Sequence, residues 1–359
     1  QAMGYFTAVL DADPPSPAGL VSHPHIQTGY EDPQGLAELA RLSDAVTTEF
    51  ENVPAAALAT LAAQRPVSPA ASAVSVAQDR AREKAHFVAC GVPCAPYAVI
   101  ETAEQLAAVS PHLLPGILKT ARMGYDGKGQ VRVKTPAELA AAWDSVGQVA
   151  CVLEKMLPLQ LECSVIVARG ADGTMVHLPV QRNLHRDGIL AVTEVYEGNL
   201  PQALVDQAVN AAKSVAKGLQ YVGVLCVEFF VLQDGRLVVN EIAPRPHNSG
   251  HYSQNACDVS QFELQVRTMA RLPLVQPRQH SPAVMLNLLG DLWFAHGEAA
   301  QTPPWAQVLA LPGTHLHLYG KRDAKRGRKM GHLNITAATP QAARATALQA
   351  AALLGIEPF

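Results

Sequence analysis

The stretch GVLCVEFFVLQDGRLVVNEIAPRPHNSGH, residues 223–251, consists of two apolar runs separated by Asp234-Gly235 and followed by a polar segment. An Asp-Gly pair between alternating apolar runs is typical of a β-hairpin closed by a two-residue type I′ turn. Opposed positions in such a hairpin have residue numbers of constant sum, and by that rule Glu228 faces Glu241. We therefore expect these two carboxylates to lie roughly 5 Å apart.

Two carboxylates at that separation need a partner. At an effective dielectric constant of ~20 they repel each other by on the order of 3 kcal/mol, more than the ~1 kcal/mol that a favourable cross-strand pair contributes. Water would screen them on a solvated face, but residues 224–232 are apolar on both faces, as in a strand buried on both sides. Because buried charges are paired or coordinate metals, Glu228 and Glu241 are candidate ligands of Mg²⁺, which proteins commonly hold with carboxylates and phosphate oxygens.

The composition excludes several classes of protein. The chain has 359 residues, 48% of them hydrophobic, and a formal net charge of −3, so it has room for two or three domains and no broad basic field for nucleic acid. No apolar run approaches the ~18 residues of a membrane span, so we expect no membrane partner. Six scattered cysteines indicate reduced thiols in a cytoplasmic protein, and no second Cys/His pair follows Cys90 and Cys94 at zinc spacing.

Residues 1–73 alternate strand and helix signals. Strands are expected over 5–13 and 44–53, and helices over 33–43 and 55–64. Such alternation indicates a parallel, Rossmann-like α/β sheet, whose ligands bind at the carboxyl ends of the strands. Glu49 and Glu51 lie at one such end, and their spacing of two predicts that they share a strand face.

Two further units follow, and the fold class is therefore α/β with three domains: 1–73, 74–270 and 271–359. The signals of the second unit are a helix over 75–91, strands at 116–119 and 151–156, a hairpin over 161–180, a helix over 201–218, the carboxylate hairpin and a helix over 260–272. After a proline-rich linker, the third unit has strands at 283–290, 315–320 and 332–337 and a helix over 340–355.

Lys119 ends a short strand and is followed by TARMGYDGKGQ, residues 120–130. The glycines in this loop let the backbone approach a ligand and turn amides toward phosphate oxygens, and the lysine supplies a point charge for the same phosphates. The loop is not a Walker A motif, because Lys128 is followed by Gly129 rather than by Ser or Thr. Without further context it is equally typical of a surface turn.

Two polar groups flank the apolar core of the second unit. Glu154 and Glu162 lie on either side of Met156-Leu157-Pro158. Singly, each is typical of a solvated charge at the end of a strand. As a pair they favour a nucleoside clamp, in which the backbone faces the base and a carboxylate faces the ribose. In the segment 240–251, Arg245 between two prolines is a candidate fork for an anion.

Histidines and cations complete the candidate groups. His247 and His251 are equally typical of ordinary loop histidines, an interpretation we favour for His251. Residues 321–329 contain six cations in nine positions. A solvated turn or a nucleic-acid patch would have this composition too, but at a net charge of −3 we favour a site for a small phosphorylated ligand.

Together these motifs resemble an ATP-grasp enzyme, and most closely the N5-carboxyaminoimidazole ribonucleotide synthetase family of purine biosynthesis. The residues that carry the resemblance are Lys119, GYDGKGQ, the Glu154/Glu162 region, QRNLHRDGIL, the Glu228/Glu241 hairpin, NEIAPRPHNSGH and GRKMGHLNIT. The likeness spans the whole chain, starting at AVLDADP and TTEFENVP. It implies a Rossmann-like N-terminal domain, a central ATP-grasp domain and a small β-rich C-terminal domain.

The resemblance also implies an activity: ATP-dependent carboxylation of 5-aminoimidazole ribonucleotide by bicarbonate, through carboxyphosphate, with ATP and Mg²⁺ as cofactors and a homodimer as the assembly. The residues implied to bind ATP are Arg80, Lys119, Gly124, Tyr125, Asp126, Gly127, Lys128, Gly129, Gln130, Glu154, Lys155, Met156, Leu157, Glu162, His185, Asn240 and Glu241. Glu228 and Glu241 would hold Mg²⁺. Tyr125, Asp126, Lys128 and Arg245 would be catalytic, and the ribonucleotide would contact Glu49, Arg245, His247, Asn248, Lys321 and Arg328.

Two departures from the family pattern bear on these expectations. The family starts with a strand and a Gly-Gly-Gly-Gln-Leu-Gly-Arg-Met loop that meets the ribonucleotide phosphate, whereas this sequence starts at Gln1; a sheet without that strand is expected to expose an edge. The family often has Arg where Lys128 stands, and Lys keeps the charge but loses the bidentate fork.

Two alternatives stay open on the sequence. One is another ATP-grasp ligase, such as a formate-using glycinamide ribonucleotide transformylase. The other is a non-catalytic ATP-binding protein, which the absent N-terminal loop favours and the intact Glu228, Glu241 and Lys119 count against.

Overall fold

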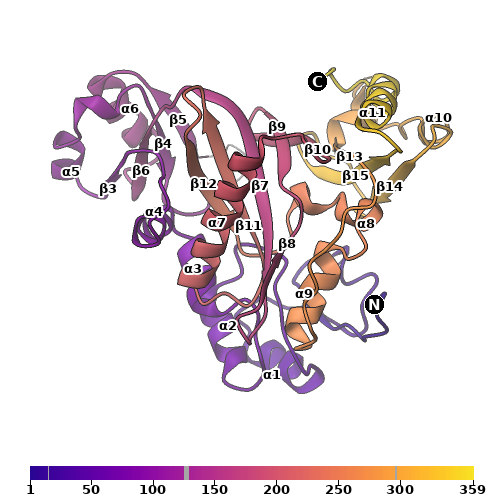
Figure 1. The fold of residues 1–359 in the computed structure, drawn as a ribbon. Coiled ribbons are helices and arrows are strands. Elements are labelled where there is room, and N and C mark those ends of the chain that lie inside the picture. The colour runs from indigo at the N-terminus through magenta and orange to yellow at the C-terminus, as the bar shows by residue number, and fades with distance from the viewer. Residues whose placement is uncertain (15, 125–128, 296) are drawn as a thin grey trace.

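The computed structural model describes residues 1–14, 16–124, 129–295 and 297–359. Three parts are visible in Figure 1: N-terminal helices, a small sheet with its own helices, and a large central sheet that continues into the C-terminal region. Within the described ranges, no helix combines the length and the apolarity needed to cross a membrane.

The N-terminal part pairs two short parallel strands, β1 (Val9–Leu10) and β2 (His25–Ile26), and continues with α1 (Pro33–Leu42) and α2 (Ala55–Ala62). Both helices lie where the sequence predicts them. Their apolar side chains, including Leu36 and Leu61, form one buried cluster, which is what an amphipathic stripe requires.

The strand expected over 44–53 is wrong. In the described chain this segment contributes a single bridge, between Val46 and Val67. Beyond it, the Thr48 hydroxyl donates a hydrogen bond to the Phe50 carbonyl at 2.8 Å, so the backbone is engaged locally instead of in a ladder. Glu49 and Glu51 therefore lie on an irregular loop and do not share a strand face.

The helix expected over 75–91 is divided into α3 (Ala71–Ala77) and α4 (Arg80–Ala89). Asp79 makes the break, because its carboxylate accepts hydrogen bonds from the backbone N–H groups of Ala81 and Arg82. This is the N-cap arrangement, which aspartate favours over a helix interior. The new start of α4 matters for the site, because Arg80, Glu83 and Lys84 are spaced by three and four residues and share one helix face.

The small sheet has the strand order β3-β6-β4-β5 and is antiparallel throughout. Its strands are β3 (Tyr97–Ile100), β4 (Gly116–Thr120), β5 (Gln130–Val133) and β6 (Cys151–Lys155). The short helix α5 (Ala103–Ala107), a 3-10 turn (Pro111–Leu113) and α6 (Pro136–Ser145) accompany them. Leu118, Leu153 and Trp143 belong to its own buried cluster, so the sheet packs as a unit beside the large one (Figure 1).

The large sheet has the order β12-β11-β7-β9-β10-β13-β15-β14, with β8 pairing with β7. Its central strands are β7 (Leu159–Arg169), β8 (Met175–His177), β9 (Gln181–Arg186), β10 (Ile189–Val195), β11 (Gly223–Leu232) and β12 (Leu237–Ala243). Helix α7 (Gln202–Gly218) packs against Leu225 and Val227 of β11, and α9 (Gln261–Met269) packs on the Val224 and Cys226 side. The prediction that β11 is buried on both faces is thus confirmed.

The C-terminal strands do not form a separate sheet. β13 (Ala283–Leu289) pairs with β10, and β15 (Lys329–Thr336) then pairs with β13 and with β14 (Thr314–Leu318). Helices α10 (Trp305–Leu309) and α11 (Pro340–Leu354) pack together with these strands. The three-domain division of the chain stays a proposal. The large sheet is continuous between the second and the third of these parts.

Candidate active site

A cavity of about 260 Å³ lies where the small sheet, α4 and the large sheet meet, and it collects most of the residues singled out from sequence. The predicted residues that line it are Arg80, Lys119, Gly124, Gln130, Glu154, Glu162, His185, Glu228, Asn240, Glu241, Arg245 and His247. Glu49, Gly129, Lys155, Met156, Leu157, Asn248, Lys321 and Arg328 are not part of its lining. Tyr125, Asp126, Gly127 and Lys128 lie outside the described residues.

The hairpin that carries the two glutamates is closed by three residues, so the expected two-residue turn is wrong. The Leu232 N–H donates to the Arg236 carbonyl at 2.8 Å, across a loop in which Gly235 has φ +83°. A left-handed glycine at the end of a three-residue loop is a common hairpin closure.

The glutamates nevertheless come to the same place, because a second irregularity offsets the first. The register shifts between Val227 and Phe229, where two residues of β12, Asn240 and Glu241, oppose the single Glu228. This is the arrangement of a β-bulge, which redirects side chains and is frequent beside functional sites.

Glu228 is a buried acid without a complete set of partners. Its residue is only 8% exposed, and its Oε1 atom accepts no hydrogen bond from the described residues. Burial, and next the charge of Glu241, raise the pKa of Glu228 to about 7. A carboxylate in this state is a strong attractor for a cation, since both causes of the shift penalise its bare negative charge.

Glu241 lies opposite but in a different environment. Its Oε2 is 3.1 Å from Arg80 Nη1, and its side chain is 40% exposed. Burial opposes ionisation of Glu241, but the charges of Arg80 and Lys119 prevail and lower its pKa. The two carboxylates thus have pKa values that shift in opposite directions, and oxygen ligands of this kind fit a hard cation such as Mg²⁺.

Lys119 and Glu154 form a buried cluster with a third residue that sequence reasoning missed, Lys84. The Glu154 carboxylate lies 3.1 Å from Lys84 Nζ through one oxygen and 3.1 Å from Lys119 Nζ through the other. All three side chains are at most 7% exposed. Burial lowers the pKa of Lys119, and the two lysines outweigh burial to lower the pKa of Glu154.

Glu83 is a second residue of α4 that sequence reasoning missed. It is 2% exposed, and its carboxylate accepts a hydrogen bond from the Ile242 N–H at 2.8 Å. Burial raises the pKa of Glu83 to about 8. The spacing of Arg80, Glu83 and Lys84 was the available signal, because it predicts that all three project from one helix face.

The other predicted clamp residues have definite partners. Glu162 pairs with His185 on the neighbouring strand β9, and this contact outweighs burial to raise the pKa of His185. The N–H groups of Lys155 and Met156 donate to the carbonyls of Pro96 and Pro115, at 2.9 Å each. These two amides therefore connect the end of β6 to the residues that precede β3 and β4.

Arg245, which lines the same cavity, is held by Glu51. Arg245 Nη2 lies 2.8 Å from Glu51 Oε2, and it is Glu51, not Glu49, that lines the cavity. Of the six cations at 321–329, Lys329 lines it. Lys321 Nζ donates to the Lys329 carbonyl at 2.6 Å.

The remaining predicted ribonucleotide residues lie outside the lining of the cavity. Arg328 Nη1 donates to the Asp323 carbonyl at 3.1 Å. The Asn248 residue is buried, and its Nδ2 has no hydrogen-bond partner in the described chain. Desolvation raises the pKa of Glu49 although the residue is exposed, and the positive charges of Arg245, Lys321 and Lys329 oppose that shift.

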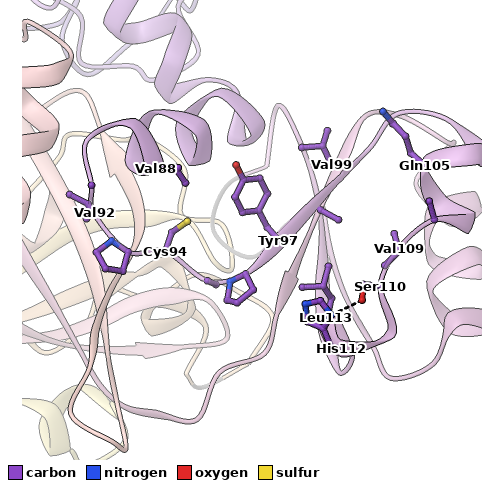
Figure 2. A pocket seen from close by; sticks show the side chains of 16 residues that line it. Val88, Val92, Cys94, Tyr97, Val99, Gln105, Val109, Ser110, His112 and Leu113 are labelled. Atoms are coloured by element: carbon purple, nitrogen blue, oxygen red, sulfur yellow. Dashed lines mark hydrogen bonds between the residues drawn. The ribbon is translucent and has the colours of Figure 1, made fainter.

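A larger cavity of about 850 Å³ lies elsewhere, against the end of α4, β3 and α5. Figure 2 shows Val88, Val92, Cys94 and Tyr97 on one side of it and Val109, Ser110, His112 and Leu113 on the other. Among the residues that the structure describes, its lining contains no Asp, Glu, Lys or Arg. The charged candidate residues line the smaller cavity instead.

Three family matches cover the chain in order. Residues 1–78 match the ribonucleotide synthetase preATP-grasp domain, residues 85–262 the ATP-grasp domain, and residues 283–346 the phosphoribosylaminoimidazole carboxylase C-terminal domain. Among curated proteins, the N5-carboxyaminoimidazole ribonucleotide synthase of Brucella melitensis is 42% identical over 337 residues, which cover 92% of this chain and 89% of that protein.

Solved structures of proteins with closely related names are also similar to this chain. The N5-carboxyaminoimidazole ribonucleotide synthetase of Thermus thermophilus superimposes with a TM-score of 0.90 at 34% identity, covering 100% of this chain and 94% of that one. The Aspergillus clavatus N5-carboxyaminoimidazole synthase, solved with ADP and 5-aminoimidazole ribonucleotide, gives 0.88 at 28% identity over 99% and 93% of the two chains. This chain thus belongs to the N5-carboxyaminoimidazole ribonucleotide synthase family of ATP-dependent ligases.

Proposed function

We propose that the 260 Å³ cavity is the site at which this chain carboxylates 5-aminoimidazole ribonucleotide with bicarbonate and ATP. The observation that carries the proposal is that different cations of the cavity lining act on the two acids. Arg80 and Lys119 act on Glu241, whereas Lys329 acts on Glu228 and, with Arg245, on His247. Two sets of cations suit two phosphorylated ligands, and the acids beside them suit a metal.

At the nucleotide end, Lys119 and Arg80 bind the ATP phosphates. The Lys84–Glu154–Lys119 cluster carries one net positive charge and is fixed by two ion pairs, so the Lys119 ammonium is positioned before ATP arrives. A cation that needs no reorganisation stabilises developing negative charge most effectively. The same phosphates are flanked by Gly124, Gly129 and Gln130. The nucleoside is contacted by Glu162, His185 and residues 154–157.

Glu228 and Glu241 hold Mg²⁺ in this proposal, with Asn240 beside them at the phosphates. The buried Glu228 Oε1 without a hydrogen bond from the described chain and the carboxylate chemistry of both groups fit that ion. Bound Mg²⁺ neutralises phosphate charge during transfer.

At the ribonucleotide end, Arg245 is the central group. Its Nη2 pairs with Glu51 at 2.8 Å and its Nη1 donates to the Pro246 carbonyl at 3.1 Å, which leaves its other guanidinium N–H groups able to donate to a phosphate or carboxylate. Lys329 lies on the cavity wall, and His247, Asn248, Glu49, Lys321 and Arg328 complete the substrate contacts that we propose.

The carboxylation itself is assigned to the loop after Gly124. We propose that Tyr125, Asp126 and Lys128, together with Arg245, orient bicarbonate and the substrate amine. In this scheme a bicarbonate oxygen attacks the γ-phosphorus of ATP and ADP leaves, which gives carboxyphosphate. The substrate amine then attacks the carboxyphosphate carbon, loses a proton and displaces phosphate. Because carboxyphosphate hydrolyses in water, the site must exclude solvent during turnover.

Two broader properties are also proposed. The family suggests a homodimer, which sedimentation of the purified chain at several concentrations would test. A cytoplasmic location is supported by the six cysteines, each of which lies in the described part of the chain and is free.

The decisive experiment measures ADP release with two substrate pairs. We expect release with 5-aminoimidazole ribonucleotide plus bicarbonate and none above background with glycinamide ribonucleotide plus formate. The reverse pattern would assign a different ligase activity. Nucleotide binding without ADP release for either pair would indicate a non-catalytic ATP-binding protein.

A further inference from the structure

Three side chains beneath the cavity bring together an unusual set of metal-ligating atoms. Cys226, Glu228 and His247 each offer one such atom, and the three atoms lie within 4.8 Å of one another. Cys226 and Glu228 are two apart on β11 and therefore project from the same strand face. His247 comes from the segment that follows β12.

The proposed Mg²⁺ site does not account for this set. A hard cation uses the glutamate oxygens and has no use for a thiol or an imidazole. His247 Nε2 lies 3.4 Å from Glu228 Oε1, yet that oxygen accepts no hydrogen bond from the described residues. Glu228 is 8% exposed and Cys226 is fully buried, so an unsatisfied carboxylate oxygen is aimed at a sulfur and a nitrogen.

Ser249 supplies the support that such ligands need. Its hydroxyl lies 3.0 Å from His247 Nδ1 and 3.8 Å from Cys226 Sγ, and it accepts a hydrogen bond from the Ser164 hydroxyl at 2.9 Å. His247 Nδ1 also accepts a hydrogen bond from the Ser249 backbone N–H at 3.4 Å. An Nε2 lone pair directed at Glu228 therefore requires the tautomer in which Nδ1 instead donates its proton to the Ser249 hydroxyl oxygen. Ligating histidines are typically oriented by a hydrogen bond of this kind from their other nitrogen.

We propose that Cys226, Glu228 and His247 form a binding site for a thiophilic divalent ion, Zn²⁺ being the reference case. Zinc sites with three protein ligands use donors of these kinds, namely sulfur, nitrogen and a carboxylate oxygen. The fourth position is open to the cavity. Bond lengths of about 2.0–2.3 Å place tetrahedral ligands roughly 3.3–3.8 Å apart, so the ligand atoms need to close by on the order of 1 Å. On binding, the thiol proton passes to solvent as the sulfur–metal bond forms.

The surrounding charges permit such an ion. Arg245 and Lys329 place positive charge near His247, but Arg245 is paired with Glu51 at 2.8 Å, and Glu241 adds negative charge at Glu228. Because the site shares Glu228 with the Mg²⁺ position of the proposed function, Zn²⁺ and Mg²⁺ exclude each other. Zn²⁺ then acts as an inhibitor, since thiolate selects it over Mg²⁺.

The test uses Co²⁺ as a coloured probe on the full chain without ATP or substrate, so its outcome is independent of catalysis. We expect a thiolate-to-Co²⁺ charge-transfer band that Zn²⁺ abolishes by displacement. Cys226→Ala should remove the band and weaken Co²⁺ binding at least tenfold, and Cys226→Ser should remove the band while keeping the fold. Absence of the band in the wild-type chain, or its persistence in both variants, overturns the proposal.

A matched control addresses the other candidate pair on the molecule. Cys90 Sγ lies 3.3 Å from His86 Nε2, so Cys90→Ala removes the thiol of that Cys/His pair. The band should be unchanged in Cys90→Ala, and a band that disappears there would assign the probe to α4 and overturn the proposal. In an active preparation, Zn²⁺ should inhibit Mg²⁺-dependent ADP release at least tenfold less strongly in Cys226→Ala; equal inhibition would contradict the shared site.

Discussion

Two groups of charged side chains at the cavity are organised in opposite ways. In the Lys84–Glu154–Lys119 cluster each carboxylate oxygen has its own ammonium at 3.1 Å. In the Glu228/Glu241 pair the acids face each other, and within the described chain Glu241 has a close cation, Arg80 at 3.1 Å. Neither Glu154 Oε1 nor Glu228 Oε1 accepts a hydrogen bond from a described residue. Glu154 Oε1 nevertheless has the Lys84 ammonium at 3.1 Å, whereas the ring nitrogen near Glu228 Oε1 is His247 Nε2, at 3.4 Å.

This difference separates residues that position the site from residues that receive a ligand. A buried charge is tolerated when opposite charges compensate it within the protein, a condition that Glu154 meets with two ammonium groups at 3.1 Å. Glu228 does not meet it, and its pKa is raised to about 7 by burial and by Glu241. The same replacement of glutamate by glutamine should therefore have different consequences in the two groups, which provides the tests below.

The largest expected effect is on turnover in Glu241→Gln. Removing one carboxylate from the proposed Mg²⁺ position should reduce kcat/KM for ADP release by at least about 10³-fold. The fold should survive, because the glutamine side chain keeps an oxygen that can accept from Arg80. The exposed Glu197→Gln variant is the matched control. Turnover within tenfold of wild type would contradict the metal assignment.

Glu154→Gln should instead damage the fold. The change removes the charge between Lys84 and Lys119, both buried, and leaving such groups uncompensated costs about 3–5 kcal/mol. Urea unfolding at neutral pH measures this loss. The double variant Glu154→Gln/Lys84→Met should recover part of it, since one of the two stranded ammonium groups is then absent. Stability equal to wild type in Glu154→Gln would show that the cluster does not hold the fold.

Sequence reasoning found the residues of the second group more readily than those of the first. An apolar strand interrupted by a glutamate is a local signal, and Glu228 and Glu241 follow from it. Lys84 and Glu83 lie on a helix rich in charges, and only the docking of α4 against β6 and β12 buries them. Tertiary burial of this kind leaves no local pattern beyond the spacing from Arg80.

The expectations from sequence that the structure contradicts also trace to contacts between distant parts of the chain. Local sequence does not distinguish a two-residue from a three-residue loop at Asp234-Gly235, and the bulge at Asn240 depends on pairing with β11. Among the six cations at 321–329, the start of β15 brings Lys329 rather than Arg328 to the cavity wall. Register, which arises from strand pairing, decided each of these outcomes.

The next effect in size is expected in how the free energy of unfolding depends on pH when no metal is bound. In the unfolded chain Glu228 ionises near its ordinary pKa, while in the folded protein it keeps its proton to about pH 7. The folded state therefore binds more protons at Glu228 between these values, and the contribution of Glu228 to stability is greatest below ~4.5 and falls by about 3 kcal/mol as the pH rises to about 7. Glu83, whose pKa is raised to about 8, adds a slope of the same sign in any variant that keeps it. The measurement is therefore the difference in urea unfolding between wild type and Glu228→Gln, in EDTA at several pH values, which should change by this amount. Equal slopes would mean that Glu228 is ionised in the folded protein.

The smallest effect tests the turn that brings the two acids together. Gly235 has φ +83°, and a Cβ added there would meet nothing within 4 Å, so Gly235→Ala introduces backbone strain without a clash. We expect a loss of about 1 kcal/mol in the free energy of unfolding. Gly235→Asn should lose less, because asparagine tolerates the left-handed region. If the alanine variant also loses ADP release well beyond its loss of stability, the turn sets the separation of Glu228 and Glu241; if turnover is unchanged, the bulge at Asn240 alone is sufficient to hold them.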